Sequence, residues 1–88
     1  MARYRIVFTP AAERAFLALS KDVQRRIDQR LLTLQDNPRP AGITALKGDA
    51  GILRLRVGDY RVLYTVHDDQ VVILIVAVGH RREIYRRK

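Results

Sequence analysis

Residues 53–80 decide the fold, and they read LRLRVGDYRVLYTVHDDQVVILIVAVGH. Apolar residues alternate with other residues on both sides of Gly58-Asp59, which predicts two strands joined by a two-residue hairpin turn. A second turn follows at residues 67–69, and the apolar run 70–78 predicts a strand at the centre of the sheet. The stretch therefore predicts three consecutive antiparallel strands.

The first half of the chain supplies one more strand and two helices. Alternation over residues 4–8 predicts the strand. Thr9 and Pro10 predict the start of a helix, because threonine caps helices and proline suits the first helical position. Ser20 predicts the cap of a second helix, which ends before Pro38. The expected fold is α+β, in the order β-α-α-β-β-β, with two N-terminal helices packed on one face of a mainly antiparallel four-stranded sheet.

Composition limits what the chain can be. Its 88 residues suffice for one domain, residues 1–88, and 48% hydrophobic with 30% charged residues is typical of a folded protein. The absence of cysteine excludes a disulfide scaffold and a thiolate zinc site, and two histidines are too few for most metal sites. We expect no metal and no cofactor. The longest apolar run, 71–78, is too short to span a membrane, and no secretory signal opens the chain, so we expect a cytoplasmic protein.

The charge balance points to a polyanionic partner. Seventeen Lys and Arg residues stand against nine Asp and Glu residues, a net charge of +8, and most of the basic residues are arginine. Arginine suits two-pronged phosphate recognition better than lysine does. The last nine residues, 80–88, hold five basic residues and one acidic residue. We therefore expect nucleic acid or an acidic protein segment to bind near the C-terminal end.

The predicted hairpin concentrates arginines on one face. Pairing about Gly58-Asp59 places Arg56 directly opposite Arg61, with Arg54 one step along, on the face away from the helices. Like charges opposed across a ladder destabilise it. Two interpretations stay open, a solvated sheet face and a phosphate-binding surface whose anion offsets the repulsion.

Residues 78–85, VGHRREIY, follow the last predicted strand directly. Arg81 can bind a phosphate, and Tyr85 can stack on a base or donate a hydrogen bond. A ring folded back on the core is an equally open alternative for Tyr85. The remaining basic residues of this end are expected to attract RNA without specificity: Arg82, Arg86, Arg87 and Lys88.

The stretches 53–64 and 78–85 resemble the RelE/ParE toxin superfamily of toxin–antitoxin systems, and the similarity extends over essentially the whole chain. The resemblance implies a type II toxin of the RelE-like branch, a ribosome-dependent mRNA endoribonuclease (mRNA interferase) that cleaves translated mRNA in the A site. It implies three partners: a cognate antitoxin, RelB-like or other; the ribosome with its A-site mRNA; and promoter DNA bound through the antitoxin.

Two other functions are compatible with the composition. ParE-type members of the superfamily inhibit DNA gyrase by protein–protein binding, and a basic module could bind nucleic acid without catalysis. The resemblance assigns catalytic roles to Arg54, Arg61, Arg81 and Tyr85, and their joint presence favours the nuclease. Arg56 matches a neighbouring basic position.

The chain departs from the best-known branch at Ile52, where that branch has a second catalytic lysine. Metal-free cleavage by the ribose 2′-hydroxyl needs charge stabilisation at phosphorus and groups that move protons. Arginine is a poor base because its pKa is above about 12. His80 and Tyr85 are therefore the candidate proton carriers, and a capping or packing role at a strand end is the alternative for His80.

Overall fold

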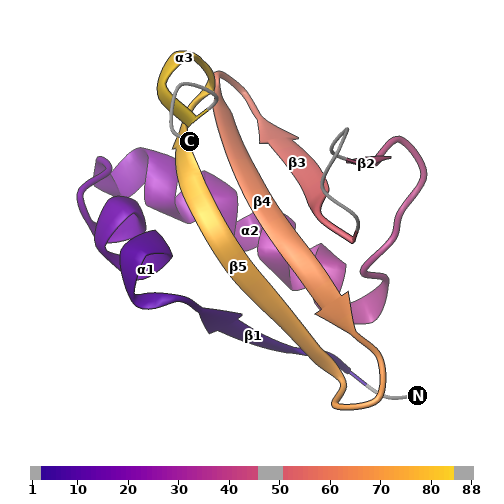
Figure 1. The fold of residues 1–88 in the computed structure, drawn as a ribbon. Helices are drawn as coiled ribbons and strands as arrows, with labels where there is room; N and C mark the ends of the chain where they lie inside the picture. The colour runs from indigo at the N-terminus through magenta and orange to yellow at the C-terminus, as the bar shows by residue number, and fades with distance from the viewer. Residues whose placement is uncertain (1–2, 46–50, 85–88) are drawn as a thin grey trace.

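A computed structural model of the chain describes residues 3–45 and 51–84, and Figure 1 shows their arrangement. One five-stranded sheet runs through it in the order β1-β5-β4-β3-β2. The strands are β1 (Arg5–Phe8), β2 (Thr44–Ala45), β3 (Leu53–Val57), β4 (Tyr60–His67) and β5 (Val72–His80). The first and last of these strands, β1 and β5, pair with each other and lie side by side. Theirs is the only parallel pairing among the described strands.

Three helices accompany the sheet: α1 (Pro10–Leu17), α2 (Lys21–Asp36) and α3 (Arg81–Ile84). The Thr9 hydroxyl accepts the backbone N–H of Ala12 at 3.1 Å, and the Ser20 hydroxyl accepts that of Val23 at 3.3 Å. Both helix starts are therefore capped at the predicted residues. No helix of the described segments is long and apolar enough to cross a membrane.

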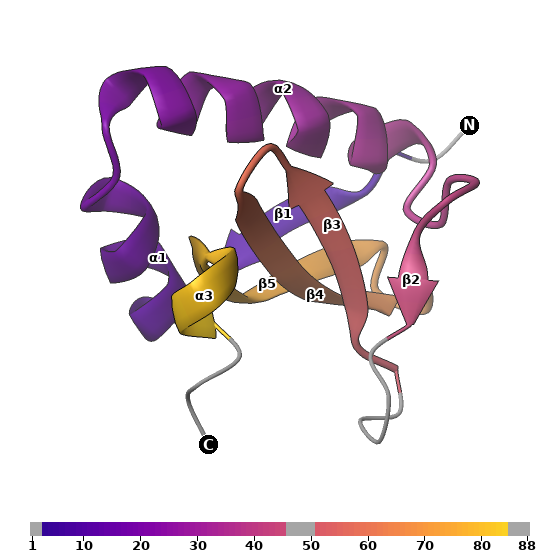
Figure 2. The same ribbon diagram turned by 90° about the horizontal axis from the view of Figure 1, so that it is seen from above.

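The core lies between α2 and the sheet. Seen from above, α2 crosses one face of the sheet, and α1 lies at its side (Figure 2). The apolar stripe of α2, with Ile27, Leu31 and Leu34 buried, packs in one cluster with buried residues of the strands, among them Tyr64 and Ile75. The packing of an amphipathic helix on an apolar sheet face holds the hairpin in place.

The structure confirms the α+β class and the element order, and it adds two elements. The sheet has five strands instead of four, because β2 pairs Thr44 with Arg54 and Ala45 with Leu53 at the edge of β3. Residues 81–84 form α3 directly after β5. Neither addition has a pattern of its own, since a two-residue strand shows no alternation and one helical turn shows no periodicity.

The predicted hairpin register is confirmed. Arg56 pairs with Arg61 and Arg54 with Leu63 across the Gly58-Asp59 turn. The β4–β5 ladder shifts register between Leu63 and Tyr64. β5 is an interior strand between β1 and β4, while the middle position of the five belongs to β4.

Two contacts fix the loop that follows α2. The Tyr64 hydroxyl, buried in the core, donates to the Pro38 carbonyl at 2.7 Å, and burial raises the pKa of Tyr64 to about 12. Arg39 binds both carboxylate oxygens of Asp68 at 3.2 and 2.9 Å, and the Tyr4 hydroxyl donates to the same carboxylate at 2.6 Å. These bonds, first Arg39 and then Tyr4, hold the pKa of Asp68 below its ordinary value.

Candidate functional site

A recess of about 570 Å³ opens at the edge of β3, between that strand, the second half of α2 and the loop after α2. We call it the arginine recess. β2 covers only the beginning of β3, so the edge of the later residues of β3 stays uncovered by a described strand. Among the described residues, the lining includes four arginines and no acidic residue: Arg30, Thr33, Pro40, Ala41, Gly42, Ile43, Thr44, Arg54, Leu55, Arg56 and Arg61.

Arg61 is the most buried of these arginines, with 7% of its surface exposed. Its Nη1 donates to the carbonyls of Gly58 and Tyr60, at 3.1 Å each, which holds the guanidinium against the hairpin turn. Among the described residues these bonds use one of its three nitrogens. The bonded nitrogen fixes the direction of the whole guanidinium group. No carboxylate of the described segments neutralises its other two nitrogens.

Arg56 and Arg54 extend the positive charge along β3. Arg56 is exposed and stands opposite Arg61, as predicted, while its carbonyl accepts Nη1 of Arg30 at 3.0 Å. Arg54 is half-buried and lines the same recess. The hairpin thus places all three arginines in the lining of one recess.

Arg81, the first residue of α3, contacts the same hairpin turn from the end of β5. Its backbone N–H donates to the Asp59 carbonyl at 2.8 Å, and its Nε lies 4.0 Å from the Asp59 carboxylate. Its exposed side chain does not line the arginine recess. Arg61 and Arg81 therefore meet at one turn, residues 58–60, rather than inside one cavity.

His80 lies on the opposite face of the sheet. It pairs with Tyr60, and the two rings pack edge to face at 5.5 Å, whereas Arg61 pairs with Gly79. Successive residues of a strand point to opposite faces, so the His80 ring and the Arg61 side chain are separated by the sheet. The Nδ1 atom of His80 accepts the Arg82 N–H at 3.2 Å at the start of α3. These contacts are the ones expected if His80 has a capping and packing role at the strand end instead of carrying protons.

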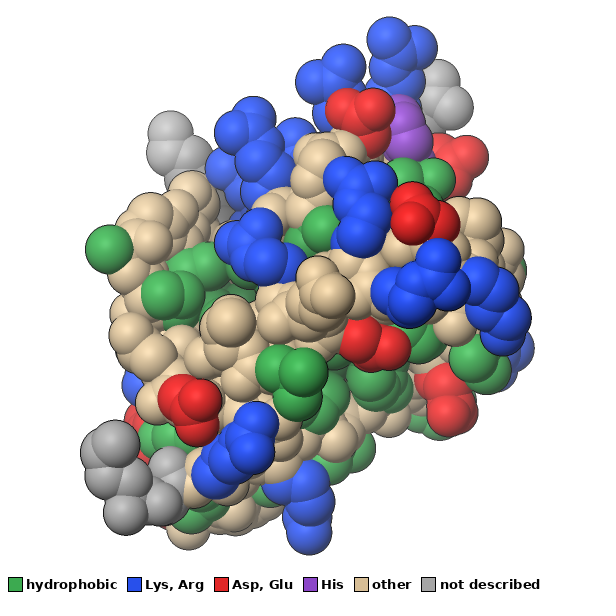
Figure 3. Space-filling model, turned by 180° about the vertical axis from the view of Figure 1, so that it is seen from behind, with side chains coloured by type: hydrophobic (Ala, Val, Ile, Leu, Met, Phe, Trp, Pro, Cys, Tyr) green, Lys and Arg blue, Asp and Glu red, His purple; other side chains and the backbone are tan. Residues whose placement is uncertain are grey.

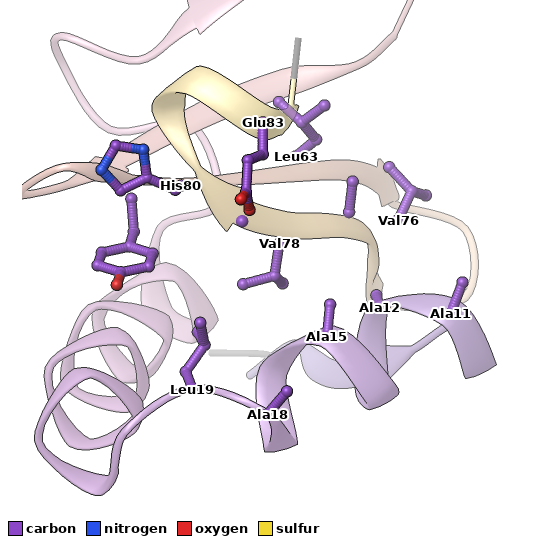
Figure 4. Close-up of a pocket in the computed structure, with 13 residues that line it drawn as sticks. Ala11, Ala12, Ala15, Ala18, Leu19, Leu63, Val76, Val78, His80 and Glu83 are labelled. Carbon is purple, nitrogen blue, oxygen red and sulfur yellow. The ribbon is translucent and has the colours of Figure 1, made fainter. Parts of the chain in front are cut away.

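A second cavity, about 720 Å³, lies between α1, α3 and the part of β5 beyond its pairing with β1 (Figure 4). Alanines of α1 and the side chains of Leu63 and Val78 form an apolar floor, and His80 and Glu83 stand at its rim. The structure therefore does not bring His80 together with the arginines.

The remaining predicted site residues divide into two groups. Arg82 is exposed on α3. Ile52, where the resemblance would place a lysine, is half-buried just before β3. The others lie outside the described residues: Tyr85, Arg86, Arg87 and Lys88. Seen from the side opposite to Figure 1, Lys and Arg side chains gather over the upper half of the molecule, the half that holds α3 (Figure 3).

Sequence reasoning missed Arg30 and the loop at residues 40–44. Arg30 follows Ile27 by three positions and precedes Leu31, so it flanks the apolar stripe of α2 and projects at the edge of the sheet. That flanking position was the available signal. Among the described residues, no group of three His, Cys, Asp or Glu side chains is placed to hold a metal ion.

Comparison with known proteins gives a family match and named relatives. The model of the family "ParE toxin of type II toxin-antitoxin system, parDE" matches residues 6–85. A putative RelE-like toxin protein of Escherichia coli is 33% identical over 81 residues, covering 90% of this chain and 84% of the relative. The mRNA interferase toxin RelE of Escherichia coli K12 is 29% identical over 86 residues, covering 93% of this chain and 90% of the relative.

A solved structure agrees with the fold as well. The toxin–antitoxin complex RelBE2 from Mycobacterium tuberculosis contains a chain that superposes with a TM-score of 0.80 at 27% identity. The match covers 94% of this chain and 97% of that one. The two chains therefore share one fold over nearly their whole length.

Proposed function

We propose that this chain, which belongs to the ParE toxin family of type II toxin–antitoxin systems and to its RelE-like branch, is a ribosome-dependent endoribonuclease that cleaves translated mRNA in the A site. The observation that carries the proposal is that two guanidinium groups lie at one hairpin turn. Arg61 donates to the carbonyls of Gly58 and Tyr60, and Arg81 lies 4.0 Å from the Asp59 carboxylate. A gyrase inhibitor acting by protein contact has no use for such an arrangement beside a recess lined by arginines. The name mRNA interferase, borne by a relative, supports the same activity.

The chemistry follows from the charge at this turn. The ribose 2′-oxygen forms a bond to the adjacent phosphorus while the bond to the 5′-oxygen breaks, which leaves a 2′,3′-cyclic phosphate and a free 5′-hydroxyl. Charge builds on the non-bridging oxygens in the transition state, and fixed guanidinium donors stabilise it there. Arg61 and Arg81 take this role, Arg54 contributes to it, and Arg56 binds the RNA backbone beside them.

In this proposal the phenol of Tyr85 gives a proton to the leaving 5′-oxygen, and a water molecule takes the proton of the 2′-hydroxyl. A base must take the proton of the 2′-hydroxyl, and an acid must give one to the leaving 5′-oxygen. The arginines stay protonated, and His80 is occupied with the start of α3 on the other face. Positive charge comes from the guanidinium groups, so we propose that cleavage needs no metal ion.

A cognate antitoxin silences the toxin in this proposal, and the toxin–antitoxin complex among its structural neighbours supports such a partner. The antitoxin is RelB-like or of another class, and the complex binds its own promoter DNA through the antitoxin. An acidic or amphipathic segment that folds on binding fits a basic surface of this kind. The toxin would act in the cytoplasm, where ribosomes translate the messages.

The test is expression of the toxin without its antitoxin, followed by mapping of transcript 5′ ends. We expect in-frame cuts within translated messages, reduced about 10²-fold or more in Arg61→Ala and Arg81→Ala, the loss typical of one transition-state donor. Arg25→Gln is the matched control, because Arg25 is an exposed arginine that pairs with Asp22 on α2, outside the recess. Cleavage of ribosome-bound message should persist when the purified toxin is treated with a chelator and then separated from it before the ribosomes are added, because in this proposal the toxin itself needs no metal ion.

Each competing function has its own signature in the same experiment. A DNA-damage response with intact messages would identify a gyrase inhibitor. A nucleic-acid-binding module without catalysis would lose more affinity for nucleic acid from charge reversal at residues 86–88 than from Arg81→Ala, because its binding depends on net charge alone.

A further inference from the structure

We propose that Arg30 of α2 is a fourth anion-binding residue of the arginine recess and holds a backbone phosphate of single-stranded RNA. The inference rests on the proposed function and adds to it a residue from a different element. It makes the recess a site formed jointly by α2 and β3.

The position of the Arg30 guanidinium is fixed by one bond. Its Nη1 donates to the Arg56 carbonyl at 3.0 Å, and its backbone carbonyl accepts the Thr33 hydroxyl at 2.7 Å. Arg56 lies beyond the two-residue β2, on the part of β3 whose edge no described strand covers. The bond therefore holds the guanidinium at the mouth of the recess before any ligand arrives, which lowers the ordering cost of binding.

The charges around Arg30 differ from those around the other α2 arginines. Arg25 and Arg26 lie 3.7 and 4.0 Å from the Asp22 carboxylate. Within residues 3–45 and 51–84, Arg30 and Arg56 take part in no ion pair, and the recess they line contains no acidic residue. Guanidinium groups gathered in this way repel one another, so an anion placed among them lowers the energy.

The chemistry of the recess favours phosphate as that anion. A guanidinium binds two phosphate oxygens at once, and four arginines line the recess. Guanidinium groups reaching in from two elements can hold a flexible single strand from two sides. An acidic protein segment is the competing ligand, and the experiment separates the two.

The experiment titrates the purified full chain with a single-stranded 2′-O-methyl RNA hexanucleotide at several salt concentrations. This probe has no free 2′-hydroxyl and cannot be cleaved, so binding is measured apart from catalysis. Arg30→Gln should weaken binding about tenfold, the usual loss for a hydrogen bond to a charged group. It should also reduce the slope of log affinity against log salt by about 0.7, the value for one phosphate contact on a single strand.

Two further variants make the result specific. Arg25→Gln removes the same charge from the same helix and should change the affinity less than about twofold, the scale of a screened surface charge. Arg30→Lys should restore the salt slope without restoring the affinity, because an ammonium keeps the charge and loses the two-pronged geometry. Circular dichroism of all three variants checks that α2 is intact.

The inference is overturned if Arg30→Gln matches Arg25→Gln, or if the unmodified chain does not bind the hexanucleotide. A parallel titration with a poly-glutamate peptide tests the competing ligand, and the inference is also overturned if Arg30→Gln weakens the binding of that peptide and leaves the binding of RNA unchanged. A chain that binds the probe through Arg30 and leaves messages uncut would keep this inference and refute the proposed nuclease.

Discussion

Val71 ends the turn between β4 and β5 with a φ of 55°, the left-handed region in which a branched side chain crowds the backbone. Two bonds hold it there. Its N–H donates to the Asp68 carbonyl at 3.3 Å, and its carbonyl accepts the Arg5 N–H at 2.9 Å. The second bond leads into the β1–β5 pairing, so the strained residue aligns the two strands.

Comparison of two truncations measures this strain. Val71→Gly should be more stable than Val71→Ala by about 1 kcal/mol, because glycine adopts positive φ without the Cβ penalty and both variants lose the same side-chain contacts. The free energy of unfolding in urea gives the difference.

Gln70 provides the control for Val71. It precedes Val71 in the same turn and does not have positive φ. At this position the order should reverse, with Gln70→Ala more stable than Gln70→Gly, because glycine loses more chain entropy on folding. Alanine ahead of glycine at both positions would contradict the strain at Val71.

At the residue scale, the sequence predicts the arginines of the hairpin and misses Arg30, which lies in the recess through tertiary packing. Arg54, Arg56 and Arg61 share a face because a two-residue turn fixes the register. Arg30 reaches the recess only because α2 packs across the sheet, and an exposed arginine on a helix is usually solvated. The face occupied by His80 follows from the β4–β5 pairing, which spacing along the chain does not determine.

Among the elements, α1 depends strongly on Thr9, the residue that precedes it. Thr9 caps α1 through its hydroxyl, and its backbone N–H donates to the Ile75 carbonyl of β5 at 3.0 Å. An eight-residue helix is too short to be stable alone. The cap and the strand contact together hold α1 beside β5.

Removal of the cap should therefore cost stability. Thr9→Ala should lower the free energy of unfolding by about 1 kcal/mol, the usual value for a lost N-cap hydroxyl. Thr9→Ser keeps the hydroxyl and should stay close to the unmodified chain, as measured by thermal or urea unfolding. Equal losses in the two variants would assign the effect to the Thr9 methyl group instead of the cap.

The elements that the sequence predicts are those with local signals. The hairpin, both helix starts and the end of α2 before Pro38 depend on residues adjacent in the chain. β2 exists only through its pairing with β3, and α3 only through its attachment to β5 and His80. Such elements gain their stability from contacts distant in sequence, so no local pattern announces them.

On the scale of the whole molecule, Asp68 joins three distant segments. It binds Tyr4 before β1, Arg39 after α2 and its own turn between β4 and β5. Because Arg39 and Tyr4 favour the ionised carboxylate, the pKa of Asp68 in the folded chain lies below the ordinary 3.8. The stabilisation is therefore present above pH 3.8 and is lost as the pH falls through the lower folded value.

Asp68→Asn tests whether the Asp68 carboxylate stabilises the fold by joining these three segments. The variant should be less stable than the unmodified chain at neutral pH, and the difference should shrink as the pH falls below 3.8. Urea unfolding across this range measures it. Asp69→Asn is the neighbouring control, because Asp69 takes part in no ion pair among the described residues, and a matching pH profile in that variant would contradict the role of Asp68.

The parallel pairing of β1 with β5 has a consequence for synthesis. β5 is the last strand to leave the ribosome, and both β1 and β4 depend on it for their hydrogen bonds. A nascent chain that lacks residues 72–80 leaves β1 without a partner among the described strands and leaves β4 paired with β3 alone, and contacts of this span form slowly. The toxin that we propose thus stays inert while its own message is being read, which leaves an interval after translation in which an antitoxin can capture it.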